Sequence, residues 1–301
     1  MKSSTRACLR KSEKNQSLEE KLFSKKEKSR RHLELLGIVL IFLAVITVYP
    51  LFLVLSNSLK TYGEVMTNVI ALPQALQWQN YLNVIKLMNY PRLFINTLIL
   101  TGLGVVGVII ISSMAGYKLS RTKTKYSWLI FLICISAIVI PFHTIMIALV
   151  KTAKQLRLIN KILGAAIIYW GLGAPFAVFL YHGFVKTIPI ELDECALIDG
   201  CSELRLFFQI IFPLLRPVTV TVTIMNAMWF WNDFLFPLLI LGGDSSQSTL
   251  QLAAYQFFGM YKSEWHYAMA SVILIITPAV FFFIALQKHI IKGMVAGAIK
   301  G

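Results

Sequence analysis

Residues 188–217 read IPIELDECALIDGCSELRLFFQIIFPLLRP and lie between two long apolar runs. A few residues suffice to connect neighbouring helices, so a connection of about thirty residues is expected to have structure of its own. Acidic residues near its start suit the first turn of a helix, and Asp199-Gly200 is a turn signal that would end that helix. Pro189 suits the first helical position, and Ser202 suits the N-cap of a second helix. The segment therefore predicts two short helices joined by a glycine turn.

The second short helix is expected to carry one apolar face. Helical spacing places Leu204, Phe207, Phe208 and Ile211 on that face. From the residues alone, the segment is either an interfacial helical hairpin held against the membrane or a docking element for another protein. Both interpretations remain open at this point.

The composition of the whole chain indicates an integral membrane protein. The chain is 57% hydrophobic and 14% charged, and its mean hydropathy is +0.69. Six apolar runs reach the length of about 20 helical residues that a bilayer requires. We predict an all-α integral membrane fold with six transmembrane helices at residues 35–55, 93–115, 128–150, 162–185, 218–241 and 268–286.

The first 32 residues form a basic segment. Eleven of the 29 Lys and Arg residues lie there, mixed with Ser, Gln and four Glu. This composition is too polar to bury a core, so we expect residues 1–32 to be a disordered tail and residues 33–301 to form the transmembrane domain. A net charge of +15 alone would suit nucleic acid, but its concentration before an apolar span indicates a cytoplasmic N-terminus instead.

An even number of spans places both termini on one side of the membrane, which we predict to be the cytoplasm. The segments on that side, including 188–217, then hold 21 of the 29 basic residues, as the positive-inside rule requires. The external loop 151–161 holds four of the other eight, which goes against the rule. In the first external segment, Trp78, Tyr81, Leu82, Ile85 and Met88 recur at helical spacing. They predict an interfacial helix that either packs on the rim of the bundle, which we favour, or docks an external partner.

Motifs for catalysis or cofactor binding are missing from the sequence. No G-x-x-x-x-G-K-[ST] phosphate loop occurs, so we expect no ATP site in this chain. Cys195 and Cys201 lack the C-x-x-C spacing and the nearby histidines of a zinc site. The histidines have no Ser or Cys nucleophile at a spacing that suggests a triad. We therefore predict no catalytic, cofactor or metal site.

The loop 188–217 resembles the signature loop of permeases from binding-protein-dependent ABC importers. That signature is Glu-Ala-Ala-x3-Gly-x9-Ile-x-Leu-Pro, and here it reads Glu194-Cys195-Ala196, Gly200, Ile210 and Phe212-Pro213. Cysteine replaces one alanine and phenylalanine replaces the leucine, and both replacements are apolar. Further segments resemble the maltose-type, carbohydrate-importing branch of that family: Ile188-Pro189, Asn96-Thr97, Ala115-Gly116-Tyr117, Trp231-Asn232-Asp233-Phe234 and Gly297-Ala298-Ile299-Lys300-Gly301.

The resemblance implies a permease subunit in a bacterial or archaeal cell membrane that carries a sugar into the cytoplasm. The implied partners are a second, different permease, two copies of a cytoplasmic ATPase that hydrolyses ATP, an extracytoplasmic solute-binding protein, the carbohydrate and membrane lipid. The first short helix of the loop would couple the permease to the ATPase. The residues carried over for that role are Glu194, Cys195, Ala196, Asp199 and Gly200.

Polar residues within the predicted spans are candidates for the translocation path. Asp233 lies deep in the fifth span, where a carboxylate facing lipid would cost roughly 2.5 kcal/mol or more, so it must face protein or water. Asn226 and Asn232 lie nearby and either line the path with it or fix helix packing. Pro141 and residues 171–175 mark expected helix irregularities. An ABC permease for a non-sugar solute and a secondary transporter remain alternatives, whereas a membrane-embedded enzyme would need a cluster of reactive residues.

Overall fold

The computed structural model describes residues 34–242, 245–258 and 264–298, with side chains to residue 285. Within these ranges the chain is helical with loops and contains no strand, which confirms the predicted all-α class. The predicted tail 1–32 and the final residues 299–301 lie outside the described residues.

The helices follow one another with short connections. In chain order they are an N-terminal helix (Glu34–Ser58), α2 (Tyr62–Thr67), α3 (Gln79–Leu87), α4 (Tyr90–Arg121), α5 (Lys125–Val139), α6 (Phe142–Gln155), α7 (Ile162–Val185), α8 (Glu191–Ile198), α9 (Glu203–Leu206), a π-helical turn (Phe207–Ile211), α10 (Phe212–Leu214), α11 (Arg216–Asn232), α12 (Leu235–Leu241), α13 (Leu250–Ala254) and α14 (Trp265–Ala298). Two short 3₁₀ turns flank α13 at Ser245–Gln247 and Tyr255–Phe257.

Four of these helices are long and apolar enough to cross a bilayer alone, namely the N-terminal helix, α4, α7 and α14. Two bent pairs of helices raise the number of candidate spans to six: Lys125–Val139 with Phe142–Gln155, and Glu203–Leu214 with Arg216–Asn232. The third predicted span, 128–150, falls on α5 and α6, which are bent by 108° relative to each other, so it is not one continuous helix. The break falls at Pro141, which has an extended backbone and no N–H to donate to the preceding turn. The irregularity predicted at Pro141 is therefore confirmed.

The fifth predicted span is also interrupted. It was expected to run through residues 218–241, but α11 ends at Asn232 and α12 begins at Leu235. Between them Asp233 has an extended backbone, and its carboxylate accepts a hydrogen bond from the backbone N–H of Phe236 at 3.3 Å. By contrast, α7 runs without interruption through Pro175, so the irregularity expected at residues 171–175 does not break the helix.

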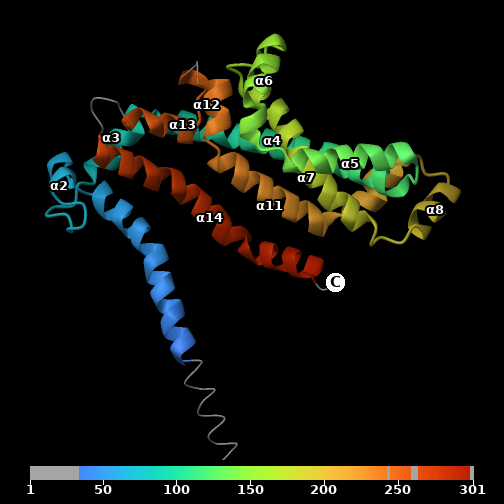
Figure 1. Ribbon diagram of the computed structural model, residues 1–301, viewed down its shortest axis with the longest axis horizontal. Coiled ribbons are helices and arrows are strands. Elements are labelled where there is room, and N and C mark those ends of the chain that lie inside the picture. Colours follow the sequence, from blue (N-terminus) through green and yellow to red (C-terminus); the bar gives the residue numbers. More distant parts are fainter. Residues whose placement is uncertain (1–33, 243–244, 259–263, 299–301) are drawn as a thin grey trace, which may run out of the picture.

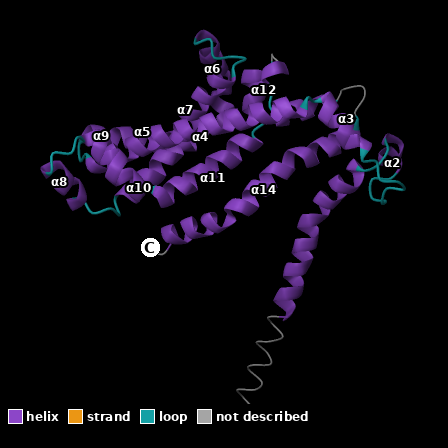
Figure 2. Ribbon diagram, turned by 180° about the vertical axis from the view of Figure 1, so that it is seen from behind, coloured by secondary structure: helices purple, strands orange, loops and turns teal. Residues whose placement is uncertain are grey.

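The long helices lie side by side and separate two sets of short elements (Figures 1 and 2). At one extremity lies α8, and at the other lie α2 and α3, in both views. The N-terminal helix extends away from the bundle, and the 18-residue window that identifies it as a span has no residue buried in this chain. One core cluster joins α4, α7 and α11 to the 188–217 segment, and a second joins α3, α13 and α14.

The predicted interfacial helix exists as α3, but its buried face differs from the expected one. Val84 and Met88 are buried together with Asn80, whereas Trp78 and Leu82 are exposed. The reason is that α3 packs against α4 and α14 along a stripe that includes the buried amide of Asn80. This packing favours the interpretation of α3 as a rim helix.

The tightest packing joins α4 to α7, and glycines allow the approach. A methyl group on Gly116 would lie 2.6 Å from Tyr181 Cβ and 2.9 Å from the backbone nitrogen of His182. A methyl group on Gly107 would overlap the indole of Trp170, whose Nε1 donates a hydrogen bond to the Leu103 carbonyl at 2.8 Å. Small residues serve this purpose at helix contacts in membranes because they let backbones come close.

We expect Gly116→Val to destabilise the folded chain, because backbone rather than a movable side-chain tip occupies the space. Overpacking of this kind costs about 2 kcal/mol, which corresponds to a melting temperature roughly 5 °C lower in thermal unfolding of the detergent-purified chain. The control is Gly102→Val in the same helix, where an added Cβ meets nothing within 4 Å. Equal melting temperatures for the two variants would contradict the importance of this contact.

Candidate coupling and translocation sites

The segment 188–217 folds as a hairpin of short helices, close to the prediction. In α8 the first turn contains Glu191, Asp193 and Glu194, as expected. Pro189 was expected at the first helical position, but α8 begins two residues later, at Glu191, and the Ile190 carbonyl accepts the backbone hydrogen bonds of Asp193 and Glu194. Gly200 has a φ of +80°, the left-handed region that favours glycine, and so turns the chain out of α8.

The second helical stretch has a different buried face from the predicted one. Ser202 caps α9 by accepting a hydrogen bond from the Arg205 backbone N–H, as expected. Leu206, Phe207 and Ile211 are buried, whereas Leu204 and Phe208 are exposed, so half of the predicted face is wrong. The wider π turn at Phe207–Ile211 changes the angular spacing of the side chains, which a regular helical period does not anticipate.

The exposed surface of α8 carries both charged and apolar side chains. Leu192, Leu197 and Ile198 are exposed there, with Ile198 at 85%. Of the residues carried over from the family signature, only Ala196 is buried, while Glu194, Cys195, Asp199 and Gly200 are exposed. These large apolar side chains are not covered within this chain, so they are available for contact with another protein.

An ion pair fixes α8 to the end of α4. The Arg121 Nε atom lies 2.5 Å from an Asp193 carboxylate oxygen, with side-chain exposures of 15% and 7%. The second arm of the same guanidinium donates a hydrogen bond to the Ile188 carbonyl at 3.1 Å. Sequence analysis missed this pair, because the two residues are 72 positions apart and no spacing rule links them. The pair therefore fixes the orientation of α8 relative to α4, a long transmembrane helix.

Burial raises the pKa of the Asp193 carboxyl, and the neighbouring Arg121 guanidinium opposes that rise. The charged carboxylate is therefore housed at a net cost despite its partner. Buried ion pairs commonly behave in this way, since removing two charges from water costs more than their attraction returns. The pair fixes the position of α8 relative to the end of α4.

The three candidate path residues occupy different environments. Asn226 is buried, donates to the Val222 carbonyl at 2.9 Å and would be 2.8 Å from a methyl group on Gly173, so it lies in the packing between α11 and α7. Asn232 is exposed and donates to the Met228 carbonyl at 2.7 Å. Asp233 is half-buried at the end of α11.

Asp233 has a buried partner that the sequence did not indicate. The Tyr169 hydroxyl donates a hydrogen bond to its carboxylate at 3.0 Å, and the Tyr169 ring stacks on Phe230 with centroids 4.0 Å apart. One carboxylate oxygen thus joins α7 to the break after α11, while the other caps α12. The side chain therefore satisfies backbone that the break exposes within the bundle.

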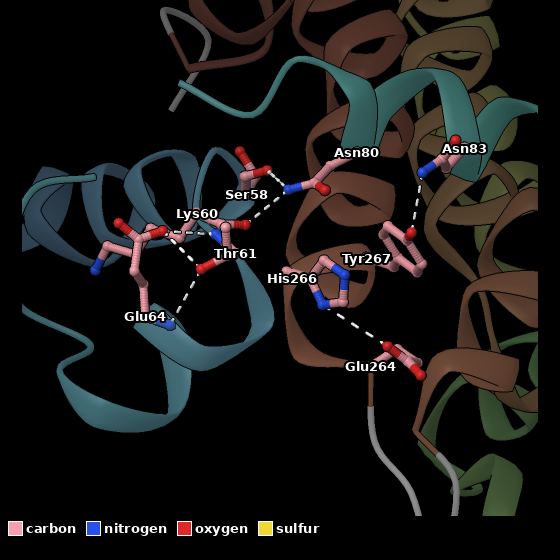
Figure 3. Close-up of polar contacts among 9 residues, drawn as sticks. All are labelled: Ser58, Lys60, Thr61, Glu64, Asn80, Asn83, Glu264, His266 and Tyr267. Atoms are coloured by element: carbon pink, nitrogen blue, oxygen red, sulfur yellow. Dashed lines mark hydrogen bonds and ion pairs between the residues drawn. The ribbon is translucent and has the colours of Figure 1, made fainter. Parts of the chain in front are cut away.

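At the opposite end of the molecule, Lys60 organises the loop after the N-terminal helix (Figure 3). Its ammonium is buried and donates to Asn57 Oδ1 at 3.0 Å and to the carbonyls of Asn68 and Val69 at 2.9 and 3.1 Å. Burial lowers the pKa of Lys60, and the charge of Glu64 opposes that change. All three ammonium hydrogens have acceptors, which fixes the loop around this side chain.

Further hydrogen bonds join this loop to α3 and α2. Asn80 of α3 donates to the Ser58 and Lys60 carbonyls at 2.9 and 2.8 Å, and Thr61 with Glu64 forms a capping box at the start of α2 (Figure 3). The loop, α2 and α3 therefore form one hydrogen-bonded unit at the end remote from α8.

Comparison with known proteins identifies the family. Residues 107–296 match the family model described as the binding-protein-dependent transport system inner membrane component. The chain belongs to this family. It is 39% identical over 268 residues to the "Probable starch degradation products transport system permease protein AmyC" of Thermoanaerobacterium thermosulfurigenes, covering 89% of this chain and 96% of that protein. It is 36% identical to the melibiose/raffinose/stachyose import permease protein MelC of Bacillus subtilis, covering 84% and 91% of the two chains.

A solved structure supports the fold of this permease. A chain of a bacterial ABC transporter involved in the import of the acidic polysaccharide alginate matches with a TM-score of 0.75 over 86% of this chain and 97% of that chain, at 21% identity. The family and its apolar helices make this chain a multi-pass inner-membrane component of a transport system. Its relatives are permease subunits, which are not themselves catalytic.

We expect Arg121→Met to destabilise the permease by roughly 3 kcal/mol, because it leaves a buried carboxylate without its partner. The folded-state pKa of Asp193 is already raised and rises further without Arg121, so the penalty applies to the charged form. The loss of stability caused by Arg121→Met should therefore be small near about pH 5. It should grow as the pH rises through the folded-state pKa of Asp193. Thermal unfolding at about pH 5 and about pH 8 measures this difference.

The double variant Arg121→Met with Asp193→Leu is the control. It removes both charges, so it should recover most of the lost stability and show no added pH dependence. A single variant that loses no more stability at the higher pH than at the lower one would contradict the assignment of the pair.

Proposed function

We propose that this permease is a membrane-spanning subunit of an ATP-driven importer that carries an oligosaccharide or related carbohydrate into the cytoplasm. The observation that carries this proposal is sequence similarity. Along most of its length, the chain is similar to permeases whose names refer to carbohydrates. Besides those above, the chain is 36% identical to the multiple sugar-binding transport system permease protein MsmG of Streptococcus mutans, over 85% of its length. The competing function is an ABC permease for a non-sugar solute.

The coupling surface is the exposed side of α8. Its apolar side chains would be buried in a groove of a cytoplasmic ATPase subunit, with Glu194, Cys195, Asp199 and Gly200 at the contact and Ala196 packed beneath it. The short ion pair to Arg121 supports this role, because it would transmit movement of α8 to α4. ATP is then hydrolysed by the partner and not by this chain.

The proposed assembly contains a second, different permease, two ATPase subunits and an extracytoplasmic solute-binding protein. The N-terminal helix supports a lipid or permease neighbour, since most of its apolar side chains are exposed in this chain. In this assembly α8 faces the cytoplasm, the N- and C-termini lie on the same side, and residues 1–32 are a cytoplasmic tail. The unit built around Lys60 then lies on the outer side of the membrane.

Reconstitution tests this function directly. The four components in proteoliposomes should accumulate a labelled oligosaccharide only with ATP and the solute-binding protein, and thermal stabilisation of that protein across a panel of sugars selects the substrate. Accumulation of a non-sugar solute with no sugar uptake would favour the competing function. ATPase activity from the purified permease alone would exclude the proposal that a partner subunit hydrolyses the ATP.

We expect Gly200→Val to abolish most sugar uptake at normal membrane levels. The φ of +80° at Gly200 is strongly disfavoured for a β-branched residue, so the turn after α8 should distort. An added Cβ meets nothing within 4 Å in this chain, so the membrane helices themselves should be unaffected. Uptake, ATPase co-purification and the ratio of ATP hydrolysed to sugar transported are the measurements.

The matched control is Gly183→Val, which also has free space around the added Cβ but an ordinary helical φ. It should transport at close to the unmodified rate. A Gly200→Val permease that assembles and transports normally would mean that the 188–217 segment is only an interfacial hairpin.

We also expect Asp233→Leu to reduce sugar uptake more than it reduces membrane insertion. The substitution removes both the acceptor for Tyr169 and the cap of α12, and it leaves a polar break beside an apolar side chain. Asp233→Asn separates charge from geometry, because the amide oxygen retains one acceptor. If Asp233→Asn restores uptake, the residue positions the break; if it does not, the charge itself is required. Unchanged uptake for Asp233→Leu at equal expression would remove Asp233 from the path.

A further inference from the structure

A hollow of about 630 Å³ lies between the α4–α5 connection and the end of α7, beside the 188–217 segment. The positively charged side chains in its lining are Lys123, Lys125 and Lys186, and its lining includes no carboxylate. We call it the lysine hollow. Its remaining lining residues are Leu119, Ser120, Thr122, Thr124, Ser127, Trp128, Phe131 and His182.

The three ammonium groups are available to a ligand. In the ranges that the structure describes, none of them forms an ion pair: Lys118 is paired with Glu203 and Arg121 with Asp193, outside the hollow's lining. The adjoining depression shares Lys123 and Lys186 and contains the carboxylate of Glu191, which bounds the hollow on the side of α8. The lysine hollow is therefore a concentration of positive charge without an internal counter-ion.

One part of the hollow's wall is apolar and is formed by Leu119, Trp128 and Phe131. Within the lining, His182 stacks on Phe131 with ring centroids 3.7 Å apart. Trp128 is 65% exposed, and Leu132, one turn further along α5, is also exposed. An exposed Trp followed by exposed aliphatic residues is typical of a helix that enters the bilayer from its interface.

We propose that the lysine hollow binds the anionic headgroup of a membrane phospholipid, whose acyl chains lie along Trp128 and α5. Positive charge, hydroxyl donors and an apolar wall in one hollow match the three parts of such a lipid: phosphate, glycerol and hydrocarbon. A soluble anion would use the charge but not the wall. A bound lipid would connect α4, α5 and α7 at the end where α8 is attached.

Native mass spectrometry of the full chain in a neutral detergent tests the proposal, with dioleoylphosphatidylglycerol and dioleoylphosphatidylcholine as the probes. The unmodified chain should bind the anionic lipid more tightly than the zwitterionic one. Each basic residue near a membrane surface contributes roughly a fivefold gain in affinity for anionic lipid. The triple variant Lys123→Gln, Lys125→Gln, Lys186→Gln should therefore lose roughly a hundredfold in that preference.

The matched control is Lys151→Gln, Lys154→Gln, Lys161→Gln, which removes the same charge from exposed lysines of the α6–α7 region. It should keep the preference. Equal binding of the two lipids by the unmodified chain, or equal loss in both triple variants, would overturn the proposal. Displacement of the anionic lipid by millimolar inorganic phosphate would overturn it in favour of a free anion. Loss of ATPase association in the first variant, with its lipid preference intact, would assign the hollow to the protein partner instead.

Discussion

The close approach of α4 and α7 is the contact on which the rest of the structure depends. Glycines at two levels of α4 let Trp170 and Tyr181 of α7 press against its backbone. The pair then forms a rigid unit with both functional regions attached: Arg121 at the end of α4 holds α8, and Tyr169 of α7 holds the break at Asp233. In the proposed transport cycle, a rearrangement of the two helices would move these two candidate regions together, as a rigid-body transition does.

Much of the fold was readable from the sequence, because the bilayer imposes a strong requirement on helix length and apolar content. The fourth predicted span coincides with α7, and the first, second and sixth lie within longer helices. The glycine turn at Gly200 and the Ser202 cap follow from local chemistry, so they were also predictable. The orientation of the chain in the membrane stays a prediction.

What the sequence did not indicate depends on contacts between distant residues or on departures from ideal geometry. Hydropathy alone does not distinguish a straight span from a bent one, so only Pro141 indicated the α5–α6 bend, and the end of α11 was missed as an interruption. Because of the π turn at Phe207–Ile211, the buried and exposed side chains differ from those that a period of 3.6 residues predicts. The Arg121–Asp193 pair and the environment of Lys60 arise only when separate elements fold together.

Two carboxylates near the ends of the bundle, those of Asp193 and Asp233, are energetically costly to bury. The directional contacts that they make explain why they are present. Asp193 is buried at a net cost, yet its pairing with Arg121 fixes one geometry for a short helix that has few other contacts with the spans. An apolar replacement would allow α8 to slide, since hydrophobic contacts are non-directional. At the break after α11, Asp233 likewise satisfies both a hydroxyl and a backbone N–H with defined directions. A permease that transmits motion from one side of the membrane to the other requires such directional contacts where its helices end, and it tolerates their energetic cost because the packed core supplies the stability.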